Sequence, residues 1–244
     1  MWALPPRRLF LEQGGLHIWR ATLDLLPEEQ GILEDLLSEE EKGQCGRFVR
    51  PADRARAVVS RASLRLVLAQ YLGGDARGLA IRAGPSGKPL LDCADPSIQF
   101  NISHTGDMAL IAVTRGLRVG IDIELIREVP EIDAIVDSFF SAPEAAWLLS
   151  REKDERTRAF FLLWTRREAA AKALGIGIYE SFARFTIPPA DQAGPGFRAE
   201  MRDAAEDPAG SWWIRDLLPA PGYAGAVCVE KDNPKPLFWI LKRQ

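Results

Sequence analysis

The sequence predicts an α+β fold arranged as two similar halves. The order strand, helix, helix, strands occurs twice, before and after about residue 118, although the halves share no obvious sequence. Each half contains one long segment with apolar residues at helical spacing, and short strands follow it. With 244 residues and 47% hydrophobic content, the chain has enough apolar side chains for one large domain or two small ones.

The first half begins with a strand and then two helices. A capping box of Ser38 and Glu41 predicts a helix start, and Gly73 and Gly74 end the long arginine-rich helix. The expected elements are a strand at 16–25, a short helix from Pro27, a helix at 51–72, a turn at 84–91, and strands at 97–103, 108–113 and 118–125.

The second half repeats this order. A second capping box, Ser141 with Glu144, marks a helix start, and Gly175 stops the long helix over 154–174. Three further strands are expected, at 212–218, 223–229 and 237–241. There are no low-complexity segments, so the whole chain reads as folded protein.

The charge balance, hydropathy and cysteine content argue against several classes of protein. The 31 Lys and Arg residues nearly balance 34 Asp and Glu residues, so no basic field indicates nucleic acid or an anionic membrane. No apolar run is long enough for a membrane span, and the first residues do not resemble a secretory signal. Cys45, Cys93 and Cys228 form no pair typical of a disulfide or zinc site. We expect a cytoplasmic protein with buried free thiols.

Two acids, Asp122 and Glu124, alternate with Ile121 and Ile123 in an apolar strand. Alternate side chains share one face of a strand, so the acids project together while the isoleucines face the core. Two carboxylates this close repel unless one is protonated or a cation lies between them. Mg²⁺ suits such a pair because it binds one or two carboxylates together with substrate phosphates. The alternative is an exposed sheet face on which both acids are solvated or paired with arginines.

Glu168 and Lys172 lie four residues apart on the second long helix, in line with Trp164. An isolated Glu and Lys at this spacing form an ordinary surface ion pair. The small neighbours, which are Ala169, Ala170, Ala171 and Ala173, instead indicate close packing around this stretch. Glu168 then becomes a third candidate carboxylate.

Ser103 and His104 fall at the end of an expected strand. A hydroxyl and an imidazole at a turn are suited to contacting phosphate, although a lone histidine is more often structural, as we expect for His17. Lys88 follows Gly87 in a turn, where glycine lets the backbone approach a ligand. This turn is not a P-loop, which requires a longer glycine-containing pattern.

Four motifs, "SGKP", "FNISHTGD", "VGIDIE" and "WTRREAAAKALGIG", occur in an order and spacing that resembles the 4′-phosphopantetheinyl transferases of the surfactin-synthetase-activating (Sfp) type. The resemblance spans roughly residues 45 to 180. It implies a pseudo-twofold monomer of two similar halves, 1–118 and 119–244, each a small antiparallel sheet packed with helices. It also implies coenzyme A in the cleft between them and an apo acyl or peptidyl carrier protein as the acceptor.

The resemblance assigns roles to the candidate residues. It implies that Mg²⁺ is held by three acids in the second half, Asp122, Glu124 and Glu168. It implies that Glu168 is the base for the carrier serine and that Lys172 contacts the pyrophosphate. It places the coenzyme A phosphate contacts in the first half, at Ser103 and His104, with Lys88 at the 3′-phosphate. To these contacts we add Arg61 and Arg54 as candidates of our own, because they are basic residues of the nearby helix. The expected products are a phosphopantetheinylated serine and adenosine 3′,5′-bisphosphate.

The chain departs from the family pattern in two places. Arg167 stands where the family usually has lysine, and Glu41 and Gln44 stand where some members have lysines. Other positive charges, among them Arg47, Arg54, Arg56 and Arg61, are candidates to bind the phosphates instead.

Two other functional classes stay open from the sequence. A metal-dependent phosphohydrolase acting on a nucleotide would need the same acids, with water as its nucleophile. A non-catalytic nucleotide-binding module would carry the acids as surface charges only.

Overall fold

The computed structural model describes residues 1–84, 88–92, 95–177, 180, 185–188, 196–201, 211–230 and 234–243. The strands are β1 (Leu16–Thr22), β2 (Ala80–Ala83), β3 (Pro89–Asp92), β4 (Ile98–Thr105), β5 (Met108–Arg115), β6 (Val119–Leu125), β7 (Phe185–Thr186), β8 (Gly196–Met201), β9 (Trp212–Leu217), β10 (Tyr223–Val229) and β11 (Leu237–Ile240). The α-helices are α1 (Gln30–Glu34), α2 (Glu39–Gly46), α3 (Pro51–Leu72), α4 (Ile132–Phe139), α5 (Ala142–Leu149) and α6 (Lys153–Leu174), and short 3-10 helices cover Pro27–Glu29 and Ala76–Gly78.

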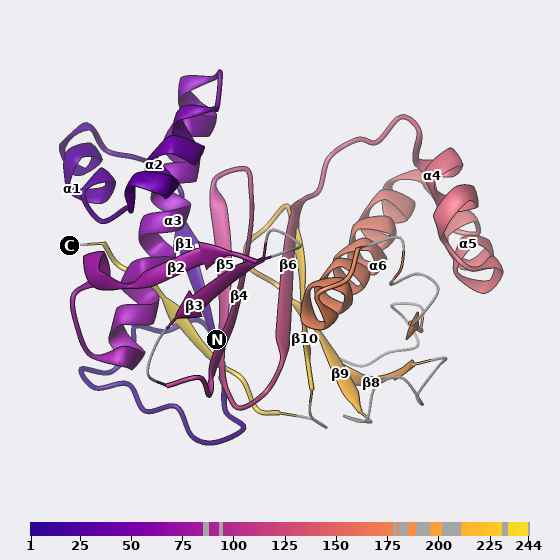
Figure 1. Ribbon diagram of the computed structural model, residues 1–244. Helices are drawn as coiled ribbons and strands as arrows, with labels where there is room; N and C mark the ends of the chain where they lie inside the picture. Colours follow the sequence, from indigo (N-terminus) through magenta and orange to yellow (C-terminus); the bar gives the residue numbers. More distant parts are fainter. Residues whose placement is uncertain are drawn as a thin grey trace.

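The fold is α+β with two sheets, as predicted. One sheet has the order β11-β1-β5-β4 and the other β6-β10-β9-β8-β7, while β2 and β3 form a separate hairpin. Figure 1 shows α3 beside the first sheet and α6 beside the second, so each half combines one sheet with one long helix. Among the described strands, β1 and β11 pair in parallel and the other pairs are antiparallel.

In the first half, α3 packs its apolar face onto the sheet. The side chains of Leu64 and Leu68 from the helix meet Trp19, Phe100 and Ile111 from the strands, and all are buried. Pro51 stands in the first turn of α3, and Gly73, with φ of +64°, follows its last residue. Both ends match the signals in the sequence, so the helix boundaries were predictable.

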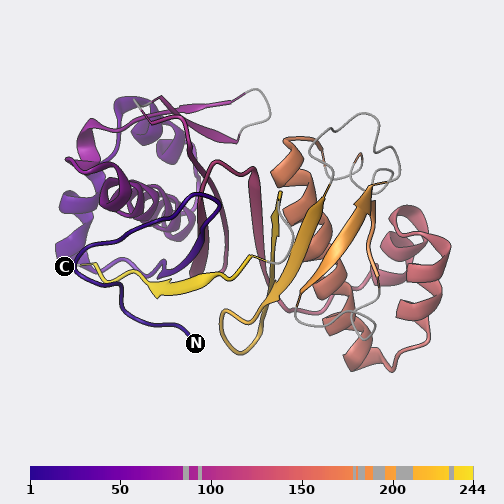
Figure 2. The same cartoon turned by 90° about the horizontal axis from the view of Figure 1, so that it is seen from below.

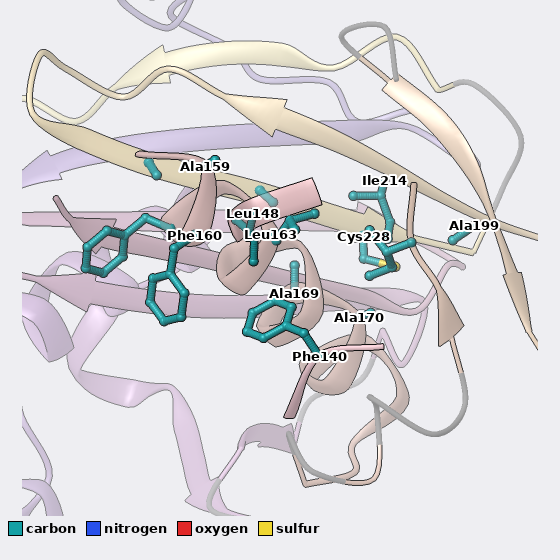
Figure 3. Close-up of a cluster of buried hydrophobic side chains, with 14 of the residues drawn as sticks. Phe140, Leu148, Ala159, Phe160, Leu163, Ala169, Ala170, Ala199, Ile214 and Cys228 are labelled. Carbon is teal, nitrogen blue, oxygen red and sulfur yellow. The ribbon is translucent and has the colours of Figure 1, made fainter. Parts of the chain in front are cut away.

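In the second half, α6 lies against β6, β10 and β9 through small side chains (Figure 3). Ala169 and Ala170 pack with Ile214 and Cys228 in one buried cluster. At Gly120 a Cβ atom would lie 2.1 Å from the carbonyl oxygen of Ala169, so only glycine lets the helix come this close. The close packing expected from the alanines is therefore present.

A third cluster of buried side chains joins the two sheets. Ile121 and Ile123 of β6 contact Ile18 and Leu110 of the first sheet, and each isoleucine is at most 1% exposed. Burying an isoleucine stabilises a fold by roughly 1.5–3 kcal/mol. The opposite face of β6, which carries Asp122 and Glu124, turns toward α6, as the alternation predicts.

Sheet membership does not follow the chain strictly. The boundary predicted between residues 118 and 119 falls in the turn between β5 and β6. The last strand, β11, then returns to the first sheet, where His17 pairs with Leu237 (Figure 2). Residues 237–240 therefore belong to the N-terminal sheet, although they lie within the expected C-terminal half.

Some elements differ from the expectation. Both capping boxes are present, with Ser38 and Ser141 as the N-caps. Part of the stretch expected as a turn at 84–91 forms β3 instead, because residues 89–92 pair with β2. Four helices and strands were not expected from the sequence, namely β2, α4, β7 and β8.

Cys45 and Cys228 are buried free thiols, as expected, and Cys93 lies outside the described residues. Within the described ranges, none of the helices combines the length and the apolar character that a bilayer crossing demands.

Candidate functional site

The two sheets meet at a seam between the edge strands β4 and β6. Among the described residues the two strands share no main-chain ladder, and side chains from one face of β4 bridge the gap. Three hydrogen bonds cross the seam. The Ile121 N–H donates to Asn101 Oδ1 at 2.8 Å, and the Ser103 hydroxyl donates to Asp122 Oδ1 at 2.8 Å. The Thr105 hydroxyl makes a longer contact of 3.4 Å with Glu124 Oε2. This arrangement places both acids of β6 where the halves join.

Asp122 is the centre of the seam. It is 2% exposed, and its Oδ1 accepts hydrogen bonds from Ser103 Oγ and, at 2.6 Å, from Lys172 Nζ. Lys172 also donates to Ser103 Oγ at 3.1 Å, which closes a triangle of three polar side chains. The second oxygen, Oδ2, is buried and has no hydrogen-bond partner among the described residues. A buried carboxylate oxygen in this state is a candidate ligand for a cation.

Two more carboxylates lie close enough to sense Asp122. Burial and, to a smaller extent, the charge of Asp122 raise the pKa of Glu124 to about 7, against the opposing effect of Lys172. Burial also raises the pKa of Glu168, with Lys172 opposing and Asp122 adding to the rise. For Asp122 itself, burial raises the pKa although Lys172 and Ser103 favour the ionised form. The charge of Asp122 therefore acts on both Glu124 and Glu168.

No ready-made metal cage is present, since within the described ranges no three His, Cys, Asp or Glu side chains converge as a ligand cluster. Lys172, not a third acid, occupies the contact with Asp122 Oδ1. The acids nevertheless fit a hard cation that keeps part of its coordination for substrate oxygens, as Mg²⁺ does. Two observations support this fit: Asp122 Oδ2 has no partner among the described residues, and the pKa values of Glu124 and Glu168 are raised in part by the charge of Asp122.

A pocket of about 260 Å³ lies in the first half and includes His104, the neighbour of Ser103. Its polar lining includes Gln44, Arg61, Arg82 and two carboxylates, and its apolar lining includes Ile81 and Ile102. Both carboxylates already have partners, since Glu41 pairs with Arg65 and Glu40 accepts a hydrogen bond from Gln44. Desolvation lowers the pKa of His104, and the positive charges of Arg61 and Lys172 lower it further. The pocket can therefore hold an anionic group against two guanidinium groups beside an apolar surface.

Two of the predicted phosphate contacts, Arg54 and Lys88, do not line the His104 pocket. Arg54 is exposed, and its guanidinium is 4.0 Å from the carboxylate of Glu34, outside the lining of the His104 pocket. Lys88 directs its ammonium to two backbone carbonyls, those of Val119 (3.1 Å) and Lys172 (2.9 Å). Burial lowers the pKa of Lys88 to about 8, and the nearby Arg118 contributes to the same direction.

The residues that depart from the family pattern have structural partners. Arg167 is 1% exposed and forms an ion pair of 2.5 Å with Glu144, which is also buried. Glu41 pairs with the buried Arg65 at 2.8 Å. Gln44 accepts a hydrogen bond from Arg61 at 3.1 Å, so this glutamine holds one of the pocket's guanidinium groups.

Sequence reasoning missed three residues of this region. Asn101 shares a strand face with Ser103, which was a usable signal, since alternate positions point the same way. Gly120 precedes Ile121 in an apolar strand, where a glycine often marks a close backbone approach. Arg82 had no signal, because its strand was not predicted.

Comparisons with known proteins identify the family of the chain. Residues 118–228 match the family model described as the 4′-phosphopantetheinyl transferase superfamily, and residues 25–115 match one described as 4′-phosphopantetheinyl transferase, N-terminal. The chain is 31% identical to the 4′-phosphopantetheinyl transferase HetI of Nostoc sp., over 98% of this chain and 97% of that protein. It is 28% identical to the 4′-phosphopantetheinyl transferase Sfp of Bacillus subtilis, over 88% of this chain and 92% of that protein. It is 33% identical to the human L-aminoadipate-semialdehyde dehydrogenase-phosphopantetheinyl transferase, over 58% of this chain and 49% of that protein.

Proposed function

Because the chain belongs to the 4′-phosphopantetheinyl transferase superfamily, we infer that it is an enzyme that transfers a 4′-phosphopantetheine arm to a carrier protein. We propose coenzyme A as the donor and the seam between β4 and β6 as the reaction centre. The observation that carries this assignment is Asp122, buried between Ser103 and Lys172 with one oxygen left unpartnered. A site of this kind suits a substrate that brings both phosphate oxygens and a cation.

In this proposal Asp122, Glu124 and Glu168 hold Mg²⁺ beside the donor pyrophosphate. The bound cation supplies charge neutralisation for the pyrophosphate oxygens. Lys172 and Ser103 donate hydrogen bonds to the same phosphates, and Lys172 already lies within reach of both the hydroxyl and the acid. In phosphoryl transfer, positioning and charge stabilisation supply most of the rate enhancement.

Glu168 is the proposed base. The oxygen of the carrier serine bonds to the β-phosphorus, the bond from that phosphorus to the bridging oxygen breaks, and adenosine 3′,5′-bisphosphate leaves. The serine proton passes to Glu168, directly or through a water molecule. Burial raises the pKa of Glu168, and a base works best when its pKa approaches the operating pH.

The His104 pocket is the proposed site for the nucleotide end of the donor. Arg61, Arg82 and His104 can contact phosphate, while Ile81 and Ile102 offer an apolar surface to a base. Arg54 lines a different surface pocket, beside Glu34, so it is the weakest of the proposed contacts.

We further propose that the enzyme is a monomer of the cytoplasm. One chain supplies every residue of the seam, and the buried thiols of Cys45 and Cys228 are typical of a reducing compartment.

The test is to incubate the protein with coenzyme A, Mg²⁺ and a panel of apo carrier proteins and then to weigh the carriers. Asp122→Asn and Glu168→Gln should each lower the turnover number by about a hundredfold or more, the effect expected when a preorganised charge or base is lost. The control is Glu155→Gln, an exposed acid on the same helix, which should be unaffected.

Near-normal turnover by both seam variants would contradict the assignment of the reaction centre. Consumption of coenzyme A without any carrier would favour the phosphohydrolase, and calorimetry of coenzyme A with and without Mg²⁺ would identify a binding module that lacks catalysis.

A further inference from the structure

Lys88 connects three parts of the molecule, namely the β2–β3 hairpin, the start of β6 and the end of α6. It immediately precedes β3, and its own carbonyl accepts a hydrogen bond from the Gly84 N–H at 2.9 Å, which fixes its backbone to the β2–β3 hairpin. Its ammonium crosses to the second half and donates to the carbonyls of Val119, at the start of β6, and Lys172, in the last turn of α6.

The carbonyl of Lys172 needs such a partner. The last four carbonyls of a helix have no partner within the helix, and a lysine near the C-terminus interacts favourably with them and with the helix dipole. The carbonyl of Ala171 is satisfied by the N–H groups of Gly175 and Ile176, at 2.9 and 3.1 Å. Lys88 does the same for the next carbonyl, from another part of the chain.

The residue held in this way is the one that contacts Asp122. The backbone of Lys172 is bound by Lys88, and its side chain reaches Asp122 Oδ1 and Ser103 Oγ. Val119, the second partner of Lys88, lies on the strand that carries Asp122. Lys88 thus ties together the two elements whose side chains form the seam triangle.

We propose that Lys88 is a positioning residue that locks the end of α6 to the start of β6 and so keeps Lys172 on Asp122. Its effect on turnover rests on the proposed function, whereas its effect on the mobility of α6 does not. A lysine that instead reached the 3′-phosphate of coenzyme A would have its ammonium turned toward the ligand. Within the described part of the chain, the two hydrogen bonds of the ammonium are both to backbone oxygens.

The experiment combines amide hydrogen exchange with kinetics. Lys88→Met removes both hydrogen bonds at similar length, Lys88→Arg keeps the charge and can donate to both carbonyls, and Lys153→Met is the control, since that lysine is 87% exposed on the same helix. In Lys88→Met, peptides that cover the end of α6 and the start of β6 should exchange about tenfold faster. Lys153→Met should leave them unchanged, and Lys88→Arg should restore most of the protection.

The kinetics separate positioning from phosphate binding. In Lys88→Met the turnover number should fall by about tenfold or more, because small misplacements of a catalytic group have effects of this size. The KM values for coenzyme A and dephospho-coenzyme A should change together and by less than about threefold. In a Lys172→Ala background Lys88→Met should lower turnover much less, since Lys88 acts through Lys172.

Two results would overturn the proposal. One is unchanged exchange at the end of α6 in Lys88→Met, and this measurement is valid even if no carrier is modified and the proposed function fails. The other is a rise of about tenfold in the KM for coenzyme A alone, which would make Lys88 a 3′-phosphate contact. If Lys88→Met does not fold, Lys88→Gln, which keeps a neutral donor, gives the same test at smaller amplitude.

Discussion

Replacing Arg167 should destabilise the fold, not weaken substrate binding. Its guanidinium and the carboxylate of Glu144 form a 2.5 Å ion pair in which the side chains are 1% and 3% exposed. Removing one partner of a buried pair costs about 3–5 kcal/mol, because the other charge is left in a poorly solvated place. Glu144 keeps its hydrogen bonds from the N–H and hydroxyl of Ser141, at 2.9 and 2.6 Å, so we expect Arg167→Met to fall near the lower limit. A loss of about 3 kcal/mol is large against the 5–15 kcal/mol of a typical domain.

The assay is urea unfolding followed by tryptophan fluorescence, with Arg158→Met, an exposed arginine of the same helix, as the control. The control should change the free energy of unfolding by less than about 0.5 kcal/mol. Adding Glu144→Gln to Arg167→Met should recover part of the loss, since the stranded charge is removed. If Arg167→Met loses no more stability than Arg158→Met, the ion pair does not stabilise the fold as argued here.

Two further predictions concern other buried positions. Gly120→Ala should lower the free energy of unfolding by about 3 kcal/mol and also lower carrier modification, because its Cβ would lie 2.1 Å from the Ala169 carbonyl oxygen. An unchanged melting temperature would show that α6 can shift at no cost. His17 is buried and its ring contacts the Tyr71 hydroxyl at 2.9 Å, and burial lowers its pKa from 6.5 to about 4. The unfolded chain therefore takes up this proton first as the pH falls, so the stabilisation is complete above pH 6.5 and declines between 6.5 and 4, by about 2 kcal/mol at pH 5. His17→Asn, which does not titrate, should lose less stability than the wild type between pH 7 and pH 5 in urea titrations, and equal losses would exclude His17 as the source.

Much of the fold could be read from local signals. The long helices α3 and α6 were predictable from their helical stretches and from the glycines, Gly73 and Gly175, that end them. The starts of α2 and α5 were predictable from their capping boxes. The hairpin β2–β3 was not predictable, because each of its strands is only four residues long. The glycines between the two strands and the proline that begins β3 are residue types typical of a turn. Short strands are defined by their partners more than by their own sequence.

For the candidate site, too, some features could be predicted from the sequence and others could not. The shared face of Asp122 and Glu124 follows from the strand period, and the stripe of Glu168 and Lys172 follows from the helix period. The ion pair of Lys172 with Asp122 did not follow from either, because it depends on how α6 is placed over β6. The burial of Arg167 was equally out of reach, since a charged residue in a helix reads as exposed until its partner, Glu144 on α5, is seen.

The return of β11 to the first sheet bears on how the chain folds as it is made. Strand β1 is synthesised before the other strands of this fold, but one of its two neighbours, β11, is synthesised after all the other described strands. Until β11 arrives, the edge of β1 next to Trp19 keeps open backbone groups that another chain could pair with. Pairing of such distant segments closes a very large loop and is slow. A ribosome-bound chain should therefore hold an incomplete N-terminal sheet until nearly all of the C-terminal half has emerged, and a fragment cut between β5 and β6 should aggregate instead of folding as an independent half.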